Sequence, residues 1–230
     1  MIVPTLKYSQ TIYEDMLKKY VNDKTKWLDL GCGHQVLPPW RLEEEKRLVA
    51  TCKQAVGIDY DMRSLMQHAT LKNRLRGDIS NLPLKNDCFT LVSANMVMEH
   101  IESPEKQFKE IYRVLNPGGV VIFHTPRYSC SISLVRIVPD FAKIKLIKLL
   151  QGREEADVFP THYRINTLDR IAEVAKRTGF EIVKLRMIET ESTFALIPPL
   201  AIIHLLFIRM KLLRPFKSFR SNIITILQKP

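Results

Sequence analysis

Short apolar runs alternate along the chain with segments of helical periodicity. The runs predict buried β-strands, and the segments in which apolar residues recur every three or four positions predict amphipathic helices. Strands are expected at 26–30, 54–60, 74–79, 88–97, 120–124, 180–188 and 221–227. Helices are expected at 8–22, 40–52, 61–72, 104–115 and 168–178. This alternation with short links is typical of a parallel α/β sheet, and we expect the last run to be a terminal edge strand.

Capping residues set the ends of two of these helices. Ser103 stands at an N-cap position with Pro104 after it, and the Pro117-Gly118-Gly119 run is expected to stop that helix. Thr167 precedes the last core helix, and Gly179 is placed to end it. A proline pair at 198–199 is expected to break the apolar run near the C-terminus.

A glycine-rich turn follows the first strand. Gly31 and Gly33 come directly after Asp29-Leu30, where glycine permits positive φ and the close approach of a ligand. The second strand ends in Asp59, and a strand, a glycine turn and an acidic strand end form the nucleotide-binding half of a Rossmann-like sheet. The third glycine is missing because Gln35 follows His34, and Pro38-Pro39 delays the next helix. This pattern disfavours a pyrophosphate cofactor and favours a phosphate-free nucleoside.

Five motifs in order carry a family resemblance. They are Asp29-Leu30-Gly31-Cys32-Gly33, Asp59, Gly77-Asp78-Ile79, Asn81-Leu82-Pro83 and Leu115-Asn116-Pro117-Gly118-Gly119. Together they resemble a class I S-adenosylmethionine-dependent methyltransferase, in the small-molecule subgroup that includes the ubiquinone/menaquinone-type (methyltransferase type 11) enzymes. The resemblance covers residues 25–126 well and 160–190 loosely. It implies a Rossmann-like α/β fold with a seven-stranded, mostly parallel sheet, helices on both faces, and the last strand antiparallel at or next to an edge.

The resemblance also implies roles for particular residues. Asp59 is expected to hold the ribose hydroxyls of S-adenosylmethionine, and Asp78 with Ile79 to bind the adenine edge. Asp29, Gly31 and Gly33 are expected to line the methionine part, and Asn95 to belong to the cofactor site. The alternative for Asp78 is a turn-forming acid after a strand.

The reaction so implied is an in-line displacement in which the protein positions two partners and manages one proton. His100 and His124 follow or end strands next to the expected acceptor position, and histidine has a suitable pKa for general-base work. A structural role is the alternative for each. The segment His162-Tyr163-Arg164 is a further candidate to reach the acceptor.

Length and composition agree with one methyltransferase domain over residues 1–230. The chain is 46% hydrophobic and 26% charged, as is ordinary for a globular protein. Its four cysteines are scattered, which indicates neither a zinc site nor a disulfide framework and favours a reduced, cytoplasmic compartment. We expect no signal peptide and no membrane span.

The net charge of +11 comes from two segments. Residues 127–153 hold six Lys/Arg against one acid, residues 192–230 hold six against none, and the remainder balances at 23 and 23. Both are also apolar, and we expect insertions at about 127–160 and 191–220 to form a lid on the acceptor side. Such a lid suits an anionic membrane surface or an apolar, anionic acceptor, which points to a cytoplasmic protein with possible peripheral membrane contact. The alternative is a pair of packing helices with solvated lysines.

The sequence favours a small-molecule or lipid-like methyl acceptor. The fourth strand ends Ala94-Asn95-Met96-Val97, without the Pro-Pro-aromatic tetrad of many nucleic-acid amino-methylases, and long aliphatics rather than aromatics accompany the basic residues. Nucleic acid is therefore disfavoured as a partner. An RNA methyltransferase stays open as an alternative, as does a catalytically silent module that binds a membrane or protein partner. The sequence sets no oligomeric state.

Overall fold

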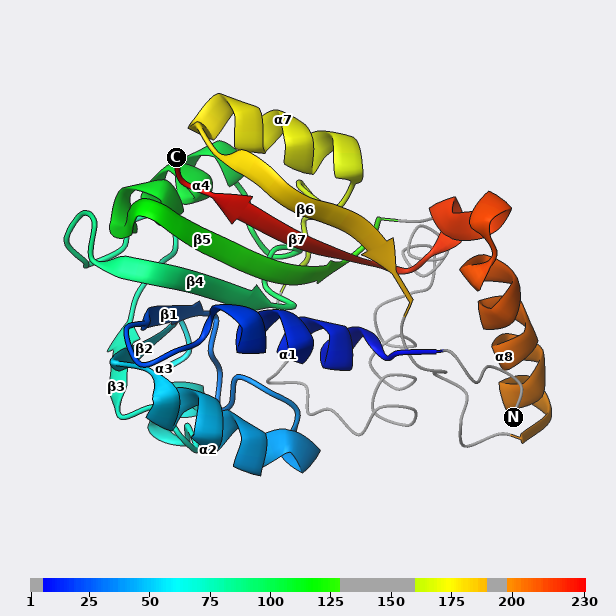
Figure 1. The fold of residues 1–230 in the computed structure, drawn as a ribbon, viewed down its shortest axis with the longest axis horizontal. Helices are drawn as coiled ribbons and strands as arrows, with labels where there is room; N and C mark the ends of the chain where they lie inside the picture. Colours follow the sequence, from blue (N-terminus) through cyan, green and yellow to red (C-terminus); the bar gives the residue numbers. More distant parts are fainter. Residues whose placement is uncertain (1–5, 129–159, 190–197) are drawn as a thin grey trace.

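The computed structural model describes residues 6–128, 160–189 and 198–230. Within these ranges seven strands form one sheet in the order β3-β2-β1-β4-β5-β7-β6 (Figure 1). The strands are β1 (Lys26–Leu30), β2 (Gln54–Asp59), β3 (Asn73–Arg76), β4 (Phe89–Asn95), β5 (Leu115–Pro126), β6 (Glu181–Ile188) and β7 (Asn222–Gln228). The first five pair in parallel, while β7 is antiparallel to both β5 and β6. Six strands therefore point one way and one the other, which confirms the predicted fold class.

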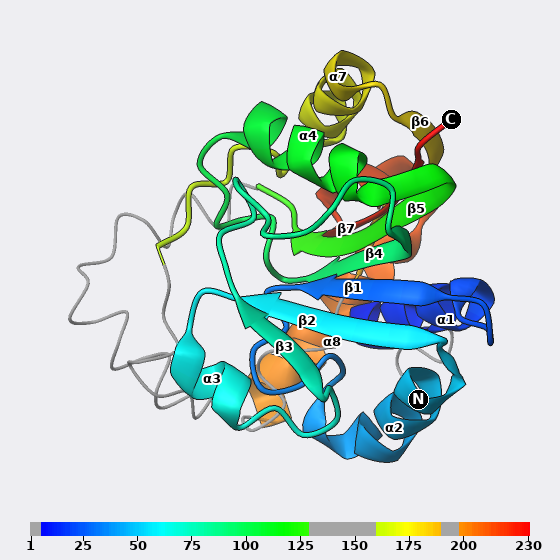
Figure 2. The ribbon, with the colours of Figure 1, turned by 90° about the vertical axis from the view of Figure 1, so that its left-hand side faces the viewer.

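Helices cover both faces of the sheet, as predicted (Figure 2). They are α1 (Ser9–Tyr20), α2 (Leu42–Thr51), α3 (Met62–Met66), α4 (Pro104–Val114), α7 (Leu168–Thr178) and α8 (Pro198–Leu212), with short 3-10 helices η1 (Pro39–Arg41) and η3 (Arg214–Phe219). One buried cluster joins the sheet to α4 and α7, and the other joins it to α1, α2 and α3. Side chains alternate between these clusters along each strand, so Phe123 of β5 faces α4 and Ile122 faces α1.

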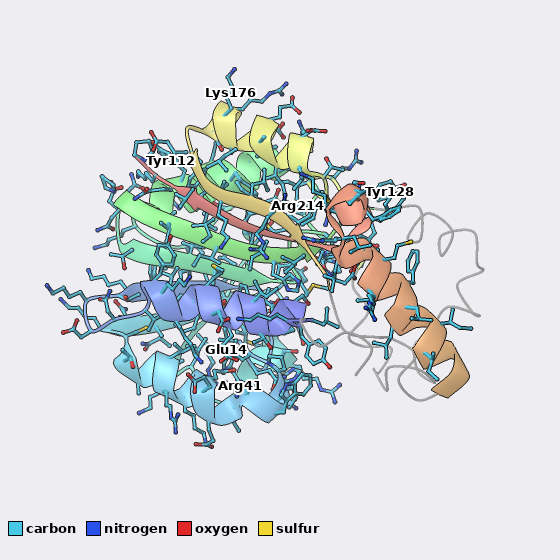
Figure 3. The ribbon with its side chains drawn as sticks, turned by 45° about the vertical axis from the view of Figure 1, so that its right-hand side comes forward. Glu14, Arg41, Tyr112, Tyr128, Lys176 and Arg214 are labelled. Carbon is cyan, nitrogen blue, oxygen red and sulfur yellow. The ribbon has the colours of Figure 1, made fainter. Side chains whose placement is uncertain are left out.

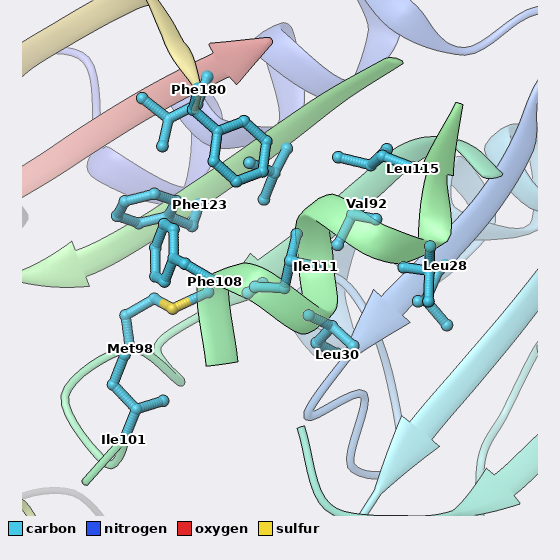
Figure 4. Close-up of a cluster of buried hydrophobic side chains, with 14 of the residues drawn as sticks. Leu28, Leu30, Val92, Met98, Ile101, Phe108, Ile111, Leu115, Phe123 and Phe180 are labelled. Atoms are coloured by element: carbon cyan, nitrogen blue, oxygen red, sulfur yellow. The ribbon is translucent and has the colours of Figure 1, made fainter. Parts of the chain in front are cut away.

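The α4 face holds the aromatic part of the core (Figure 4). Phe108 packs edge-on against Phe123 and Phe180, with ring centroids 5.8 and 6.2 Å apart. Such T-shaped pairs add to the stabilisation from burial. They join α4, β5 and the start of the β6 segment, so the helix that follows β4 is held against the half of the sheet that contains β6 and β7.

The C-terminal strand does not lie at the edge. β7 sits between β5 and β6, and β6 is the edge strand, so the expected terminal edge position of residues 221–227 is wrong. The looser expectation, that the antiparallel strand lies next to an edge, is confirmed. The burial pattern explains the placement, because six consecutive residues of β7 are buried whereas β6 exposes much of its length. A continuously buried strand belongs inside a sheet.

Two elements are shorter than predicted. The helix expected over 61–72 ends at Met66, because His68 Nδ1 accepts hydrogen bonds from the backbone of Thr70 and Leu71 and draws the chain out of the helix. The third strand ends at Arg76 rather than 79. There the Asp78 side chain accepts from the backbone N–H of Ser80 and turns the chain away from the ladder.

The boundary between α4 and β5 also differs from the prediction. The helix ends at Val114, and residues 117–119 lie within β5 instead of stopping the helix. Backbone bonds from Asp87 to Arg113 and from Cys88 to Val114 bring the chain alongside β4 already at this point. Ser103 takes the N-cap position without a side-chain bond, whereas the predicted cap at Thr167 and stop at Gly179 are both confirmed.

The two basic segments leave the carboxyl ends of β5 and β6, as the strand assignments predicted. Most of the first segment lies outside the described residues, since 129–159 are not among them. The second contains α8 and η3, which stand beyond the end of the sheet where β5 and β6 finish (Figure 1). Helix α8 begins at Pro198, and residues 190–197 before it are outside the described residues, so the expected break of the apolar run at the proline pair stays a prediction. In the described part of the chain, no helix is long and apolar enough to cross a bilayer.

Candidate functional site

The glycine turn after β1 is packed on one side and open on the other. Gly31 and Cys32 donate their backbone N–H groups to the carbonyl of Ile58, at 2.7 and 3.2 Å. Gly31 has φ +62°, and a Cβ there would overlap the side chain of Val97. Gly33 has φ +52°, and a Cβ on it would meet nothing within 4 Å. Glycine is thus required at Gly31 by packing, and at Gly33 it leaves backbone exposed to a ligand.

Asp59 ties this turn to the end of β2. One carboxylate oxygen accepts from Gly33 N at 2.8 Å, and the other accepts from Asp61 N at 2.8 Å. A carboxylate oxygen has room for about two donors, so both retain acceptor capacity. Because β1 and β2 are neighbouring parallel strands, Asp59 and the turn meet at the carboxyl edge of the sheet. The structure therefore brings Gly31, Gly33 and Asp59 together as the sequence predicted.

The chain after the turn offers no helix N-terminus to a pyrophosphate. The backbone N–H groups of Val36 and Leu37 instead donate to one buried oxygen of Glu45, at 2.9 and 2.8 Å. Helix α2 begins only at Leu42. These two backbone N–H groups already bind an anion, the carboxylate of Glu45, and are not available to a pyrophosphate. This agrees with the expected nucleoside without a pyrophosphate.

Asp29 lies behind the turn rather than in it. Its side chain is 3% exposed and accepts from the Ser93 hydroxyl, which in turn accepts from Trp27 Nε1 at 2.7 Å. Burial raises the pKa of Asp29 to about 8, against the hydrogen bond from Ser93, which lowers it. Asp29 shares the α1 face of the sheet with Trp27, so its expected contact with the methionine part stays a prediction.

The residues after β3 form an exposed turn. Both carboxylate oxygens of Asp78 bind Ser80, one its backbone N–H and the other its hydroxyl, each at 2.7 Å. These bonds lower the pKa of Asp78. Ile79 is half-buried against the α4 face of the core. The turn-forming role weighed for Asp78 is thus present, and the adenine contact of the pair stays a prediction.

Asn95 connects three elements at the carboxyl edge. Its Nδ2 donates to Gln10 of α1 at 2.9 Å, and its Oδ1 accepts from His124 Nδ1 of β5 at 2.9 Å. The adjacent Met96 has φ +57° and donates its backbone N–H to the His124 carbonyl. A non-glycine residue in this conformation marks a position that the surrounding structure forces. Asn95 therefore fixes α1 over the end of β4, which lies at the switch point of the sheet.

The two candidate bases have different surroundings. His124 is 1% exposed and contacts Asn95, and burial lowers its pKa to about 4, which favours the structural alternative; its role as a base stays a prediction. His100 is only half-buried, and its Nδ1 lies 2.7 Å from the carbonyl of Pro160. A carbonyl only accepts, so Nδ1 carries the proton and the lone pair of the neutral ring is on Nε2. Exposure thus favours His100 over His124 as the candidate base, and a catalytic role for His100 stays a prediction.

An aromatic pair lies on the same edge. The rings of Tyr128 and Tyr163 are 5.8 Å apart, and Tyr163 has φ +52°. The carbonyl of Glu99 accepts from the backbone of His162 and Tyr163, so this loop is fixed directly to the residue before His100. His162 itself contacts Glu102 through Nε2 at 3.3 Å.

A buried polar network holds that loop to β5. Thr125 donates to Glu99 at 2.9 Å, and Asn166 donates to Thr125 at 2.7 Å. Sequence reasoning missed Gln10, Ser93, Tyr128, Thr125 and Asn166 as parts of the site. Only Ser93 left a sequence signal, a hydroxyl inside an otherwise apolar strand.

A doubly wound sheet, an open glycine turn tied to an acidic strand end, and an antiparallel last strand define the class I S-adenosylmethionine-dependent methyltransferases. Residues 7–185, more than half of the chain, match the family described as "Methyltransferase domain". The chain belongs to this family, and the family assigns S-adenosylmethionine as the methyl donor. The open backbone at Gly33 and the acceptor capacity of Asp59 fit the nucleoside part of that donor.

Curated relatives match only part of the chain. Malonyl-(acyl-carrier protein) O-methyltransferase of Pectobacterium atrosepticum is 32% identical over 98 residues, which are 43% of this chain and 37% of that protein. Norajmaline N-methyltransferase of Rauvolfia serpentina is 28% identical over 151 residues, 63% of this chain and 49% of that protein. The chain thus spans less than half the length of these two relatives.

Solved structures extend the likeness to the whole fold. A SAM-dependent methyltransferase from Methanosarcina mazei superposes with a TM-score of 0.60. The superposition covers 93% of this chain and 96% of that one, at 16% sequence identity. At this identity the likeness establishes the shared fold.

Proposed function

We propose that this chain transfers a methyl group from S-adenosylmethionine to a small-molecule or lipid-like acceptor. One juxtaposition carries the proposal: the open turn at Gly33, tied to Asp59, lies on the same sheet edge as His100 and the Tyr128–Tyr163 pair. Gly33 and Asp59 are thus suitable groups for the methyl donor, and His100 and the tyrosine pair are suitable groups for the acceptor. The relatives named above act on small or carrier-bound molecules by their names, which supports an acceptor of this kind.

Each group has a defined task in this proposal. Asp59 accepts hydrogen bonds from the ribose hydroxyls, and Gly33 lets the nucleoside lie against the backbone. When bound, the sulfonium supplies an electrophilic methyl group. His100 Nε2 takes the proton that the acceptor loses, and the two tyrosines hold the acceptor body at the edge. His124 and Asn95 position α1 over the end of β4 and take no proton.

Calorimetry on the purified protein tests this assignment. The parent should bind S-adenosylmethionine or its demethylated product, and Asp59→Ala should weaken binding by roughly 1.5–3 kcal/mol because charge-assisted hydrogen bonds to the ribose are lost. His100→Gln should leave donor binding unchanged and reduce methylation of an acceptor. Asp23→Ala, an exposed acid before β1, is the matched control and should change neither.

The same measurement separates the alternatives. No donor binding to the parent would refute methyl transfer and leave a silent module of this fold. Donor binding with methylation of RNA instead of small molecules would favour the nucleic-acid alternative. Equal donor affinity in Asp59→Ala and the parent would refute the role of Asp59 alone.

The surface of α8 supports a lipid-like acceptor met at an anionic membrane. Its described residues expose large aliphatic and aromatic groups, with Ile203 64% and Leu206 53% exposed. Arg214 and Lys217 follow at the end of the helix, and residues 192–230 contain no acid. An apolar surface beside cations suits the interface of an anionic bilayer better than bulk water.

A further inference from the structure

A groove lies on the α1 face, separate from the glycine turn. Its volume is about 630 Å³, within the usual range for small-molecule sites. The groove runs between α1, the edge strand β6 and the end of α8. It is lined by Lys7, Ile12, Asp15, Met16, Lys18, Lys19, Lys184, Arg186, Ile188, Glu189, Leu212 and Arg220.

The register of β6 directs its cations into this groove. Lys184, Arg186 and Ile188 are two residues apart and so share one face of the strand. Ile188 is buried in the cluster that contains α1, whereas Leu185 and Met187 pack on the opposite face. Lysines on an edge strand often serve only to prevent pairing with another chain. Here they point over α1 instead, and Lys184 Nζ lies 3.6 Å from Met16 Sδ.

Three of the cations, Lys19, Lys184 and Arg186, form no ion pair with any of the described residues. Burial lowers the pKa of Lys184, and the charges of Arg186 and Lys19 lower it further. The three positive charges are therefore close enough to repel one another, and an anion placed between them would relieve this repulsion.

The acids of the groove are already neutralised. Glu189 is buried in an ion pair with Lys211 at 2.7 Å, and Asp15 faces Lys7 at 3.8 Å. Lys18 is held by Glu14 and Glu44. Arg220 donates to three backbone carbonyls and forms no ion pair with a described residue, so these contacts do not neutralise its charge. The groove as a whole thus carries an unbalanced positive charge.

The floor of the groove is apolar. Ile12, Met16 and Ile188 are buried members of one core cluster, and Leu212 adds the end of α8. An inorganic anion would occupy only a small part of the volume. A ligand with an apolar body and an anionic head would cover the floor and reach the cations.

We propose that this groove is a second ligand site, which binds a single-chain amphiphile with a phosphate head. The head lies among Lys19, Lys184 and Arg186, and the chain lies along Ile12, Met16 and Leu212. The site is distinct from the methyl-transfer edge and does not depend on that activity. Its ligand comes either from solution or from the headgroup layer of a membrane.

The test uses decyl phosphate below its micelle concentration, measured by calorimetry on the full chain without S-adenosylmethionine. Decyl phosphate should bind at least about tenfold more tightly than decanol, which lacks the phosphate head, or glycerol phosphate, which lacks the apolar chain. Lys184→Gln/Arg186→Gln should lose at least about tenfold in affinity. Lys184→Arg/Arg186→Lys should retain binding because it keeps both charges.

A matched variant controls for net charge. Lys53→Gln/Lys176→Gln removes two exposed cations elsewhere, one of them on α7, which covers the sheet face opposite to α1 (Figure 3). Equal loss in this variant and in Lys184→Gln/Arg186→Gln would overturn the site, as would equal binding of decanol and decyl phosphate. S-adenosylmethionine binding, measured on the same samples, reports whether each variant is folded and tests the methyl-transfer proposal separately.

Vesicles distinguish the two sources of the head. If the ligand is a membrane lipid, decyl phosphate should compete with binding to vesicles that contain lysophosphatidate, the single-chain lipid with a phosphate head. If it is a soluble compound, decyl phosphate should bind, and the lysophosphatidate vesicles should bind the groove variants and the parent equally. Absence of decyl phosphate binding to the parent would refute the proposal from either source.

Discussion

Asp29 is a carboxyl group held almost without water, in contact with Ser93 and beneath α1. Burial, assisted by the charges of Glu45 and Asp59, raises its pKa from 3.8 to about 8. The folded protein therefore binds this proton more tightly than the unfolded chain does. Between the two pKa values, unfolding releases the proton, so the free energy of unfolding falls as the pH rises.

We predict that Asp29→Asn removes this pH dependence. The free energy of unfolding of the parent should decline between pH 6.5 and 8 with a slope of up to about 1.4 kcal/mol per pH unit, and that of the variant should be flatter. His68 and His124 contribute little there, because their folded pKa values near 4 and unfolded value of 6.5 lie at or below the window. Urea titrations at several pH values measure the slopes.

An exposed acid provides the comparison. Asp23→Asn changes the same chemical group on the surface and should leave the slope of the parent intact. Parallel slopes for the parent and Asp29→Asn would show that the buried carboxyl does not titrate in this range.

For single residues, the sequence predicts the place of a side chain in the fold better than it predicts the burial and contacts of that side chain. Asp59 could be placed because it ends the strand that follows the glycine turn, and the carboxyl ends of neighbouring parallel strands meet at one sheet edge. For Asp29 the same logic fails, since its burial depends on the packing of α1 over one face of the sheet and on Ser93 of β4, which is far away in the sequence. His124 likewise looked available, but it lies in the last part of a strand that α1 and β7 bury completely.

The helix α8 shows the same limits for an element. Its apolar and basic composition could be seen in the sequence, but its place beyond the end of the sheet could not. The structure also revises which cations are available on it. Lys211 is buried in an ion pair with Glu189 and lies 5.0 Å from the ring centre of Phe207, so it anchors the helix. Arg214 and Lys217 remain exposed.

We predict that α8 and η3 attach the protein to anionic vesicles. Each exposed cation near such a surface contributes up to about 1 kcal/mol, so Arg214→Gln/Lys217→Gln should weaken co-sedimentation roughly 10- to 30-fold. Binding should also fall as salt rises, because screening shortens the reach of the charges to about 8 Å at 0.15 M. Neutral vesicles and the Lys53→Gln/Lys176→Gln variant are the controls.

Two outcomes would contradict this prediction. Equal binding to anionic and neutral vesicles would mean that the charges play no part. Unchanged binding in Arg214→Gln/Lys217→Gln would make α8 an ordinary packing helix and move the acceptor towards a water-soluble compound.

A second link between elements explains why α1 is well placed without a side-chain cap. Arg41 binds Glu14 through two nitrogens, at 2.7 and 2.6 Å, and Lys18 joins Glu14 to Glu44 of α2 (Figure 3). These bonds lower the pKa of Glu14. The sequence predicted a helix over 40–52 but not this link, because the partner residues lie in another element.

For the whole molecule, the sequence predicted the number and direction of the strands and missed their order at one end. The alternation of strands and helices and the order of the motifs are local properties of the sequence, and the structure contains the predicted alternation. The place of β7 between β5 and β6 is a long-range choice, decided by which of two strands buries both faces. The extent of the domain over 1–230 stays a prediction.

Lys229 closes this end of the sheet. It is 9% exposed, and its Nζ contacts Asp87 at 2.7 Å and the carbonyls of Tyr112 and Leu115 at 3.0 and 2.7 Å. The charge also lies 4.6 Å from the ring centre of Tyr112. One side chain thus binds the turn before β4, the end of α4 and the start of β5.

We predict that Lys229→Ala destabilises the folded protein by roughly 1.5–3 kcal/mol, because two buried carbonyls and one carboxylate lose their donor. Urea denaturation should show a lower midpoint with an unchanged slope. Lys85→Ala, an exposed lysine near the same turn, should change the midpoint little. A similar shift for both variants would show that Lys229 acts only through net charge.

The position of β7 between β5 and β6 constrains the order in which the strands can pair during folding. In the described sheet, β6 pairs with β7 and not with β5. Although β6 is synthesised before β7, it cannot join the sheet until β7 has paired with β5. A nascent chain that has reached residue 188 has its nucleoside-binding half complete and β6 still without a hydrogen-bonded neighbour. The half that binds the donor can therefore form early, whereas the half that carries α8 must wait until residue 228 leaves the ribosome. Because non-local strand pairing is slow, we expect the groove beside β6 to be completed late in folding.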